Sequence, residues 1–254
     1  MTICTYIIKE VLFMKKYIVL ILLLAIAVLP ACSNQDMAIV DQNGKTIQVT
    51  SDGKDSYTFR LPEKQPALST WKNPFIDVYE EDWFYKSVCF CHENNLIKGT
   101  TETTFSPNQP TSRAMIVSIL WRLEGSPDTG TLRFTDVPAD QYYADAIAWA
   151  ASEGIVSGYD MTHFAPDTPI SREQLASILY RYTTYHGWDT TTTTTLDSFA
   201  DANEISAYAV DALSWAVSHD IINGMEGNLL TPHDTAIRAQ AAAILMNFCN
   251  NSGV

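Results

Sequence analysis

One stretch of sequence occurs three times after residue 72, and no other feature of the chain restricts its fold so strongly. The first two copies align at a constant offset of 59 residues without a gap, and the third follows at an offset of 65 and then 66. A single copy cannot bury its apolar side chains alone, so we expect the three copies to pack into one body with approximate threefold symmetry. The recurring positions are Phe75, Phe134 and Phe199; Asp77, Asp136 and Asp201; Trp83, Tyr142 and Tyr208; Gly99, Gly158 and Gly224; and Arg113, Arg172 and Arg238.

Each copy has the pattern of two helices joined by a loop, which predicts an all-α body. In the second copy, small and apolar residues between Tyr143 and Ala151 recur at the three-and-four spacing of an amphipathic helix. Phe164, in the loop that follows, is expected to fill the space between the two helices. The second helix opens at Ser171, and Gln174 three residues later completes the pattern of a capping box.

An arginine occupies the start of every second helix, where a positive charge is unfavourable next to the helix dipole. Two interpretations of this placement stay open. In the first, the guanidinium, the dipole and the free amide groups of the first turn form a site for a carboxylate or phosphate. In the second, each arginine forms an internal ion pair, with the recurring aspartate as its partner. The residues concerned are Arg113, Arg172 and Arg238, with Asp77, Asp136 and Asp201.

The order and spacing of these motifs resemble the S-layer homology (SLH) domain of bacterial envelope proteins. The shared pattern is a Phe-x-Asp motif, an aromatic residue, a helix followed by Gly, a Phe-x-Pro loop in the first two copies, and an arginine that opens a second helix. It covers about residues 73 to 250 in three copies. The resemblance implies a three-pronged, pseudo-threefold bundle that binds secondary cell-wall polysaccharide, commonly through pyruvylated sugars in grooves between repeats. A pyruvate ketal presents a carboxylate, the ligand that the first interpretation of the arginines requires.

Carried over to this chain, the resemblance makes the recurring arginines, aspartates, aromatic residues and glycines candidate glycan-binding residues. Trp83, Tyr142 and Tyr208 would stack on a sugar ring, or else pack over a helix start. Gly99, Gly158 and Gly224 would allow positive φ or a close backbone approach, or serve as ordinary helix C-caps. Met115 replaces the capping acid of the family in the first copy, and Ile237 replaces the hydroxyl cap in the third.

The N-terminus has the pattern of a secretory signal peptide over residues 1–31, with Met14 as the expected start. Lys15 and Lys16 precede an apolar run of residues 17–29, which is too short to span a bilayer. Residues 29–32 resemble the bacterial lipobox, which implies diacylation of Cys32, and two acyl chains suffice for stable membrane anchoring. The alternative is ordinary signal cleavage after Ala31. We expect an extracellular, cell-wall-associated protein, lipid-anchored to the outer face of the cytoplasmic membrane.

The remaining boundaries follow from the repeats and from turn residues. Residues 32–72 form a linker in which Asn43-Gly44 and Asp52-Gly53 separate short alternating stretches, and this predicts a small β-meander. The three copies are expected to span residues 73–130, 131–195 and 196–254.

Neither charge nor motifs favour catalysis, a metal or nucleic acid. The net charge of −13 repels nucleic acid, and the sequence has no nucleophile elbow, zinc-protease motif or phosphate-binding glycine loop. Cys89, Cys91 and His92 have the wrong spacing for a zinc site. We therefore expect a non-catalytic anchoring protein without cofactors. The alternative is an envelope protein-interaction scaffold or assembly subunit that does not bind glycan.

Overall fold

The computed structural model describes residues 37–40, 46–51, 57–60 and 71–251. The chain divides into two compact units, Met1–Thr70 and Trp71–Val254. The expected signal peptide and Cys32 lie outside the described residues. No helix among the residues described is long and apolar enough to cross a membrane.

The first unit contains three strands, β1 (Met37–Val40), β2 (Thr46–Ser51) and β3 (Tyr57–Arg60). They pair antiparallel in the order β1-β2-β3. In this register Ile39 lies opposite Ile47, and Val49 lies opposite Phe59.

The second unit is helical, and each copy contributes two α-helices. The helices are α3 (Tyr85–Glu93) and α4 (Arg113–Leu123) in the first copy, α5 (Ala144–Ser152) and α6 (Arg172–Tyr185) in the second, and α7 (Val210–Ser218) and α8 (Arg238–Asn251) in the third. The capping box predicted at Ser171 and Gln174 is confirmed at the start of α6. Two 3-10 turns, η1 (Ala202–Glu204) and η2 (Ala207–Ala209), precede α7.

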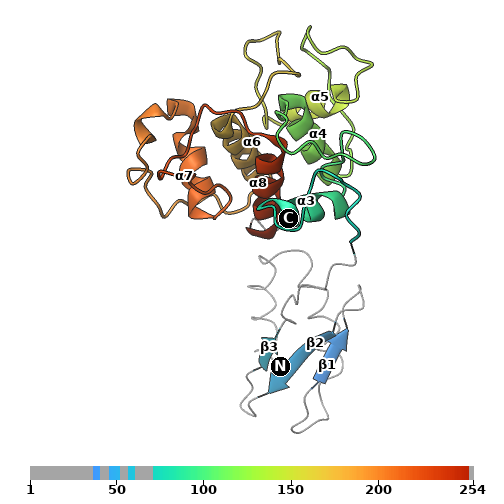
Figure 1. Ribbon diagram of the computed structural model, residues 1–254, viewed down its shortest axis with the longest axis vertical. Coiled ribbons are helices and arrows are strands. Elements are labelled where there is room, and N and C mark those ends of the chain that lie inside the picture. The colour runs from blue at the N-terminus through green and yellow to red at the C-terminus, as the bar shows by residue number, and fades with distance from the viewer. Residues whose placement is uncertain (1–36, 41–45, 52–56, 61–70, 252–254) are drawn as a thin grey trace, which may run out of the picture. The chain divides into compact units, whose positions relative to one another are not determined.

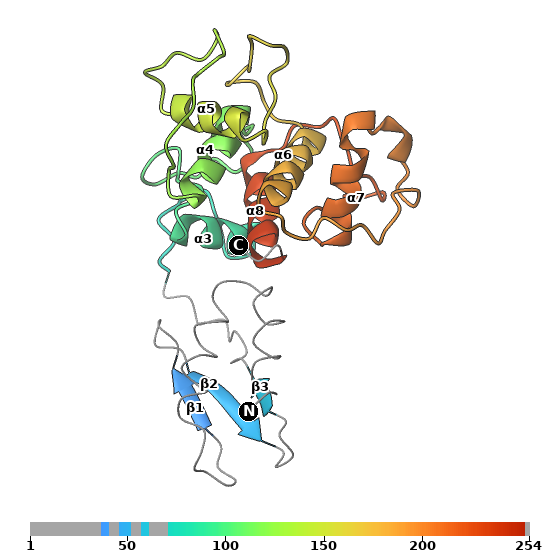
Figure 2. The ribbon, with the colours of Figure 1, turned by 180° about the vertical axis from the view of Figure 1, so that it is seen from behind.

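The helices pair between copies rather than within them. α4 packs against α5, α6 packs against α7, and α8 of the last copy packs against α3 of the first. Figures 1 and 2 show these three pairs from opposite sides. The third pair joins the two ends of the repeated region, so the three copies form a closed ring.

Phe164 takes part in the contact between copies. Its ring is fully buried, packs against Phe134 and lies under the guanidinium of Arg113, 4.6 Å from ring centroid to Cζ. Phe164 therefore packs within its own copy and also contributes to the contact with the first copy.

Three backbone hydrogen bonds form a ring where the copies meet. The amide of Thr111 donates to Ala236, Ala236 donates to Ile170, and Ile170 donates to Thr111, with N···O distances of 3.0, 2.9 and 2.8 Å. The three residues occupy equivalent positions in the three copies. Since the cycle closes, removing one copy breaks two of the three bonds.

The first amides of the second helices are also used between copies. The amides of Arg113 and Ala114 donate to the carbonyls of Thr168 and Pro166 in the second copy, at 3.1 and 3.0 Å. The next amide, that of Met115, donates to the Ser112 hydroxyl. The same pattern joins Arg172 and Glu173 to the third copy, and Arg238 and Ala239 to the first. The free amides that an anion site would need at these positions are therefore absent, and that part of the expectation is wrong.

The recurring arginines hold the loop of the next copy. Nε of Arg113 donates to the carbonyl of Phe164 (3.1 Å), and Nη2 donates to that of Ser157 (3.1 Å). Arg172 makes the equivalent bonds to Leu230 and Asn223, and Arg238 makes them to Phe105 and Lys98. All three arginines are buried. Hydrogen bonds of this kind, made by a buried charged group, are stronger than neutral ones.

The recurring aspartates hold the same loops from within their own copy. The Asp136 carboxylate accepts from the amides of Phe164 (2.9 Å) and Ala165 (2.7 Å). Asp77 binds the amides of Phe105 and Ser106, and Asp201 binds those of Leu230 and Thr231. Among the described residues, none of the three aspartates forms an ion pair with a recurring arginine. Burial alone would raise the pKa of Asp136, but the hydrogen bonds from Phe164 and Ala165 outweigh it and lower that pKa.

Replacing Arg238 by Met tests whether this ring closure stabilises the whole body. The change leaves the carbonyls of Phe105 and Lys98 without their donor, so we expect the free energy of unfolding to fall by about 3 kcal/mol. Urea unfolding followed by circular dichroism measures this loss. Arg181→Met, at a residue with no hydrogen bond among the described residues, should change it by less than about 0.5 kcal/mol. Equal losses in the two variants would contradict the account.

Candidate functional site

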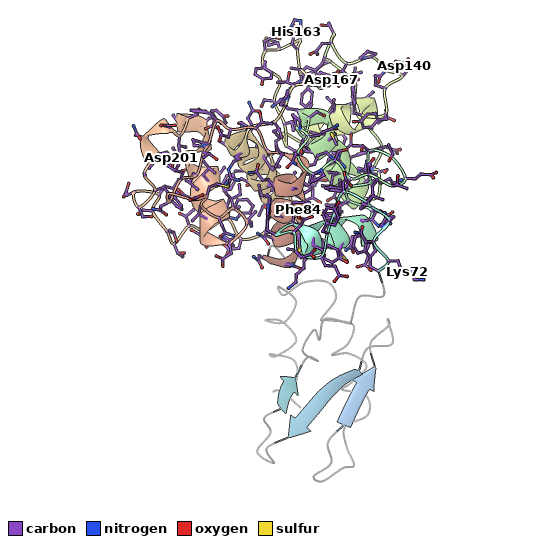
Figure 3. All side chains as sticks on the ribbon, in the orientation of Figure 1. Lys72, Phe84, Asp140, His163, Asp167 and Asp201 are labelled. Carbon is purple, nitrogen blue, oxygen red and sulfur yellow. The ribbon has the colours of Figure 1, made fainter. Side chains whose placement is uncertain are left out.

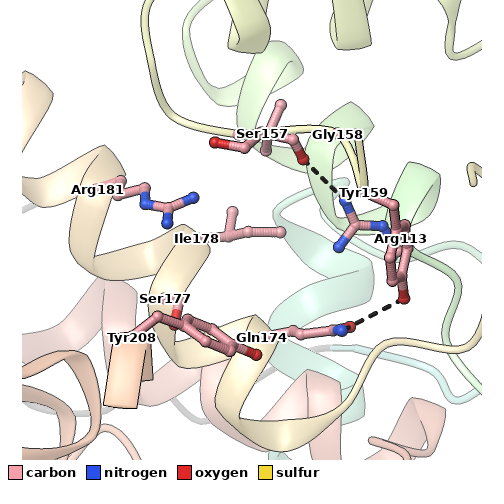
Figure 4. Close-up of a pocket in the computed structure, with 10 residues that line it drawn as sticks. Arg113, Ser157, Gly158, Tyr159, Gln174, Ser177, Ile178, Arg181 and Tyr208 are labelled. Atoms are coloured by element: carbon pink, nitrogen blue, oxygen red, sulfur yellow. Dashed lines mark hydrogen bonds between the residues drawn. The ribbon is translucent and has the colours of Figure 1, made fainter. Parts of the chain in front are cut away.

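A groove of about 350 Å³ lies where residues from all three copies meet. Its walls are α6, the loop after α5, the start of α4 and the turn before α7 (Figure 4). The residues that line it include Arg113, Gly158, Gln174, Ser177, Arg181 and Tyr208. Three of the candidate residues, Arg113, Gly158 and Tyr208, are thus brought together, each from a different copy.

Arg113 lines the groove and is itself buried. Burial lowers the pKa of its guanidinium, although an arginine stays charged at any physiological pH. The guanidinium lies over the rings of Tyr159 and Phe164, at 4.9 and 4.6 Å from the centroids. Nε and Nη2 each donate to a loop carbonyl, so two of its five N–H groups are committed to the fold.

Arg181, on the outer side of the groove, was not among the residues predicted from sequence. Its half-buried side chain points into the groove (Figure 4). Among the described residues it forms no hydrogen bond and no ion pair. The sequence does carry a sign of it, because an arginine stands nine residues after the recurring arginine in the first two copies, as Arg122 and Arg181.

The equivalent positions in the other two copies differ from Arg181. Arg122 donates through Nη2 to the carbonyl of Leu96 at 3.0 Å. Asn247 replaces the arginine in the third copy, and its amide donates to the carbonyl of Ile221 at 3.4 Å. The three related places therefore have different chemistry despite the shared fold.

The recurring aromatic residues are exposed. Trp83 and Tyr142 expose 65% of their surface and Tyr208 exposes 54%. Trp83 and Tyr142 contact the following residue edge to face, through Phe84 and Tyr143. Phe84 and Tyr143 are the N-cap residues of α3 and α5, so both rings pack over a helix start, as one interpretation expects. Their high exposure also leaves surface open to a ligand, so both interpretations stay open.

Glu173 fixes Tyr208 and is a second residue that sequence reasoning missed. Its carboxylate is buried and accepts from the Tyr208 hydroxyl (2.9 Å) and the Ser206 hydroxyl (2.8 Å). Burial, followed by the hydrogen bond to Glu173, raises the pKa of Tyr208. Ala114 and Ala239 occupy the equivalent positions in the other two copies. The presence of an acid in the second copy alone was therefore the feature of the sequence that could have identified Glu173.

The recurring glycines are explained by close packing. A Cβ on Gly158 would lie 2.4 Å from the carbonyl oxygen of Asp160 and 2.6 Å from the ring of Phe134. Gly99 meets Thr101 and Phe75 in the same way, and Gly224 meets Phe199. None of the three has positive φ, so the close-approach interpretation is right and the positive-φ interpretation is wrong.

The two departures from the family pattern have local effects. Met115 still donates its amide to Ser112, so the first copy keeps half of its cap. In the third copy Ile237 offers no hydroxyl, but its amide donates to the Gln240 side chain at 3.2 Å, which preserves the other half.

Cys91, Cys249 and His92 take part in packing. Cys91 is buried, and its thiol donates to the carbonyl of Ala242. His92 accepts through Nδ1 from the Trp71 indole at 3.0 Å. Across the described part of the chain, no three His, Cys, Asp or Glu side chains gather in a way that could hold a metal ion. Side chains such as Asp140, His163 and Asp167 are exposed on outer loops (Figure 3).

Comparison with known proteins agrees with the repeats and with the geometry. The S-layer homology domain family matches residues 74–114, 133–176 and 198–242, about half of the chain. The chain is 30% identical over 193 residues to an amylopullulanase of Thermoanaerobacterium thermosulfurigenes, covering 74% of this chain. It is 29% identical over 217 residues to an exoglucanase of Acetivibrio thermocellus, covering 84%. A surface-layer 125 kDa protein of Lysinibacillus sphaericus is 31% identical over 159 residues, covering 61%.

These alignments span 10, 19 and 13% of the relatives' own lengths. The similarity to the two enzymes therefore involves only a small part of each. The chain belongs to the S-layer homology domain family, of which it carries three copies, and this membership indicates association with the cell surface.

Proposed function

We propose that this chain is a non-catalytic protein that attaches to cell-wall polysaccharide through grooves between its three copies. One observation carries the proposal: an exposed aromatic ring from one copy and a guanidinium from another face the same groove. A flat aromatic face suits the apolar side of a sugar ring, and a guanidinium suits a carboxylate such as that of a pyruvate ketal. A relative named as a surface-layer protein is consistent with this role.

We further propose that the chain is secreted and lipid-anchored through Cys32, as the lipobox-like residues 29–32 predict. The linker of residues 33–72 would then join the membrane to the wall polymer. A fully extended linker of this length reaches on the order of 130 Å. Binding near the inner face of the wall follows from that limit.

Sedimentation with isolated cell walls tests the proposed attachment. The chain from Ser33 onward should pellet with walls that keep their attached polysaccharide, because the grooves bind that polymer. It should stay in the supernatant after the polysaccharide has been removed from the walls by acid. Retention on stripped walls would contradict glycan binding and favour a scaffold that binds a protein or the peptidoglycan itself.

Truncating the aromatic residues tests whether the grooves are the contact. The variant Trp83→Ala, Tyr142→Ala, Tyr208→Ala should bind intact walls at least about tenfold more weakly, a loss of ~1.4 kcal/mol or more. The matched control is Ile76→Ala, which removes another exposed apolar side chain (69% exposed) outside the groove. Equal binding by the two variants would place the contact elsewhere on the surface.

Replacing Cys32 by Ser tests the lipid anchor. The thioether that carries the diacyl group cannot form on serine, so the protein should move from the membrane fraction to the medium and lose incorporation of labelled fatty acid. Fractionation of cells that express each form measures the change. An unlabelled wild-type protein would contradict lipidation without affecting the wall-binding proposal.

A further inference from the structure

A run of six threonines, residues 190–195, lies in the linker between the second and third copies. Neither the ring contacts nor the groove accounts for it. The third copy starts six residues later than the spacing of the first two copies would place it. Helix α6, with 14 residues against 11 in α4, takes up half of that difference. The linker takes the rest, so it is longer than the linker between the first two copies.

The composition of the run does not suit a simple spacer. Flexible spacers are rich in Gly and Ser, whereas threonine is β-branched and stiff at χ1. The run instead carries a hydroxyl group at each of six consecutive positions, and residues 191–195 are all exposed. Exposed tracts rich in hydroxyl groups are typical acceptors of O-linked sugars.

The main chain of the run is fixed against the third copy. The amides of Thr193 and Thr194 both donate to the hydroxyl of Ser218, the last residue of α7, at 3.1 Å. Leu196, directly after the run, is buried. The backbone therefore holds the run in place, and the side chains face the solvent.

A second threonine-rich stretch, residues 100–104, uses its hydroxyl groups differently. The hydroxyl of Thr100 forms a hydrogen bond with that of Ser106 (2.6 Å), and the hydroxyl of Thr101 accepts from the amide of Thr104 (3.0 Å). Those hydroxyls hold their own loop. Within the part of the chain that the structure describes, the hydroxyls of residues 192–195 have no hydrogen-bond partner. They can therefore be modified without loss of a contact that the fold needs.

We propose that residues 192–195 are a site of O-glycosylation. In this reaction a threonine Oγ1 attacks the anomeric carbon of a sugar that is carried on a phosphate, supplied as a nucleotide or lipid conjugate. The bond between Oγ1 and the anomeric carbon forms while the bond from that carbon to the phosphate oxygen breaks. The threonine proton passes to a base of the transferase, and the phosphate carrier leaves with the bonding electrons.

A sugar suits this position better than a phosphate group does. Asp189 and Asp197 flank the run, and the whole chain has a net charge of −13. A phosphate group would add negative charge beside these acids, and like charges at short range repel. A neutral sugar adds no charge.

The proposed site is separate from the groove. No residue of the run lines the groove. The run is bound at Ser218, where α7 ends, whereas Tyr208 of the groove lies in η2, directly before α7 begins. A sugar on the run would lie at the opposite end of α7 from Tyr208. The proposal therefore does not depend on wall binding.

Mass spectrometry of the chain isolated from the cells that naturally make it tests the proposal. The proteolytic peptide that contains residues 190–195 should be heavier, by one or more whole sugar residues, than the same peptide from a chain made by cell-free translation without sugar donors. Electron-transfer fragmentation should place the added mass on residues 192–195. Equal masses, an added mass that corresponds to phosphate, or sugar confined to other residues would overturn the proposal.

Two matched variants, expressed in the same cells, locate the acceptor. Changing residues 192–195 to Val keeps the branched side chains and the amides bound to Ser218 but removes the hydroxyl nucleophile, so this peptide should lose its sugar. The control changes Thr129→Val and Thr131→Val, two exposed threonines of the linker between the first two copies, and should keep the sugar. Thermal unfolding of both variants should match that of the wild type. Full retention of the sugar after the change at residues 192–195, or equal loss in the control, would contradict the assignment.

Discussion

The structure of the helical unit depends on one peptide segment in each copy that is held from two sides. The amide of Phe105, Phe164 or Leu230 is bound by the aspartate of its own copy, and its carbonyl is bound by the arginine of the preceding copy. The third arginine reaches back to the first copy, so the arrangement has no free end. An open solenoid needs capping repeats at its ends, whereas this closed ring does not. Each copy is therefore stabilised by two neighbours at once.

This arrangement separates structural residues from those available to a ligand. The recurring arginines are committed to the ring, and so are the first amides of the second helices. Other groups are left for a ligand: Tyr208 and the half-buried Arg181 line the groove, and Trp83 and Tyr142 are exposed at the equivalent positions. A common scaffold can then carry different side chains at equivalent positions, since Asn247 stands where the second copy has Arg181 and the ring contacts are kept.

Much of this fold could be predicted from the sequence, because the offsets of the repeats and the capping box at Ser171 depend only on local spacing. Which helices pair could not, because the apolar pattern of α5 indicates which face is buried but not which helix covers it. The role of the arginines depended on which carbonyls lie within reach, and those carbonyls belong to a neighbouring copy. The recurrence of Arg122 and Arg181 was visible as well. Within the described part of the chain, Arg122 makes a side-chain hydrogen bond and Arg181 makes none, and this difference depends on how each side chain is placed in three dimensions.

The central claim is that a groove between the copies, and not the outer face of the ring, meets the wall polymer. Chemical-shift mapping by NMR, with soluble polysaccharide released from walls and added to the chain from Ser33 onward, tests it most directly. The account predicts that the largest shifts occur at Gly158, Gln174, Arg181 and Tyr208. Shifts confined to the outer loops around His163 and Asp140, or no shifts at saturating polymer, would contradict it.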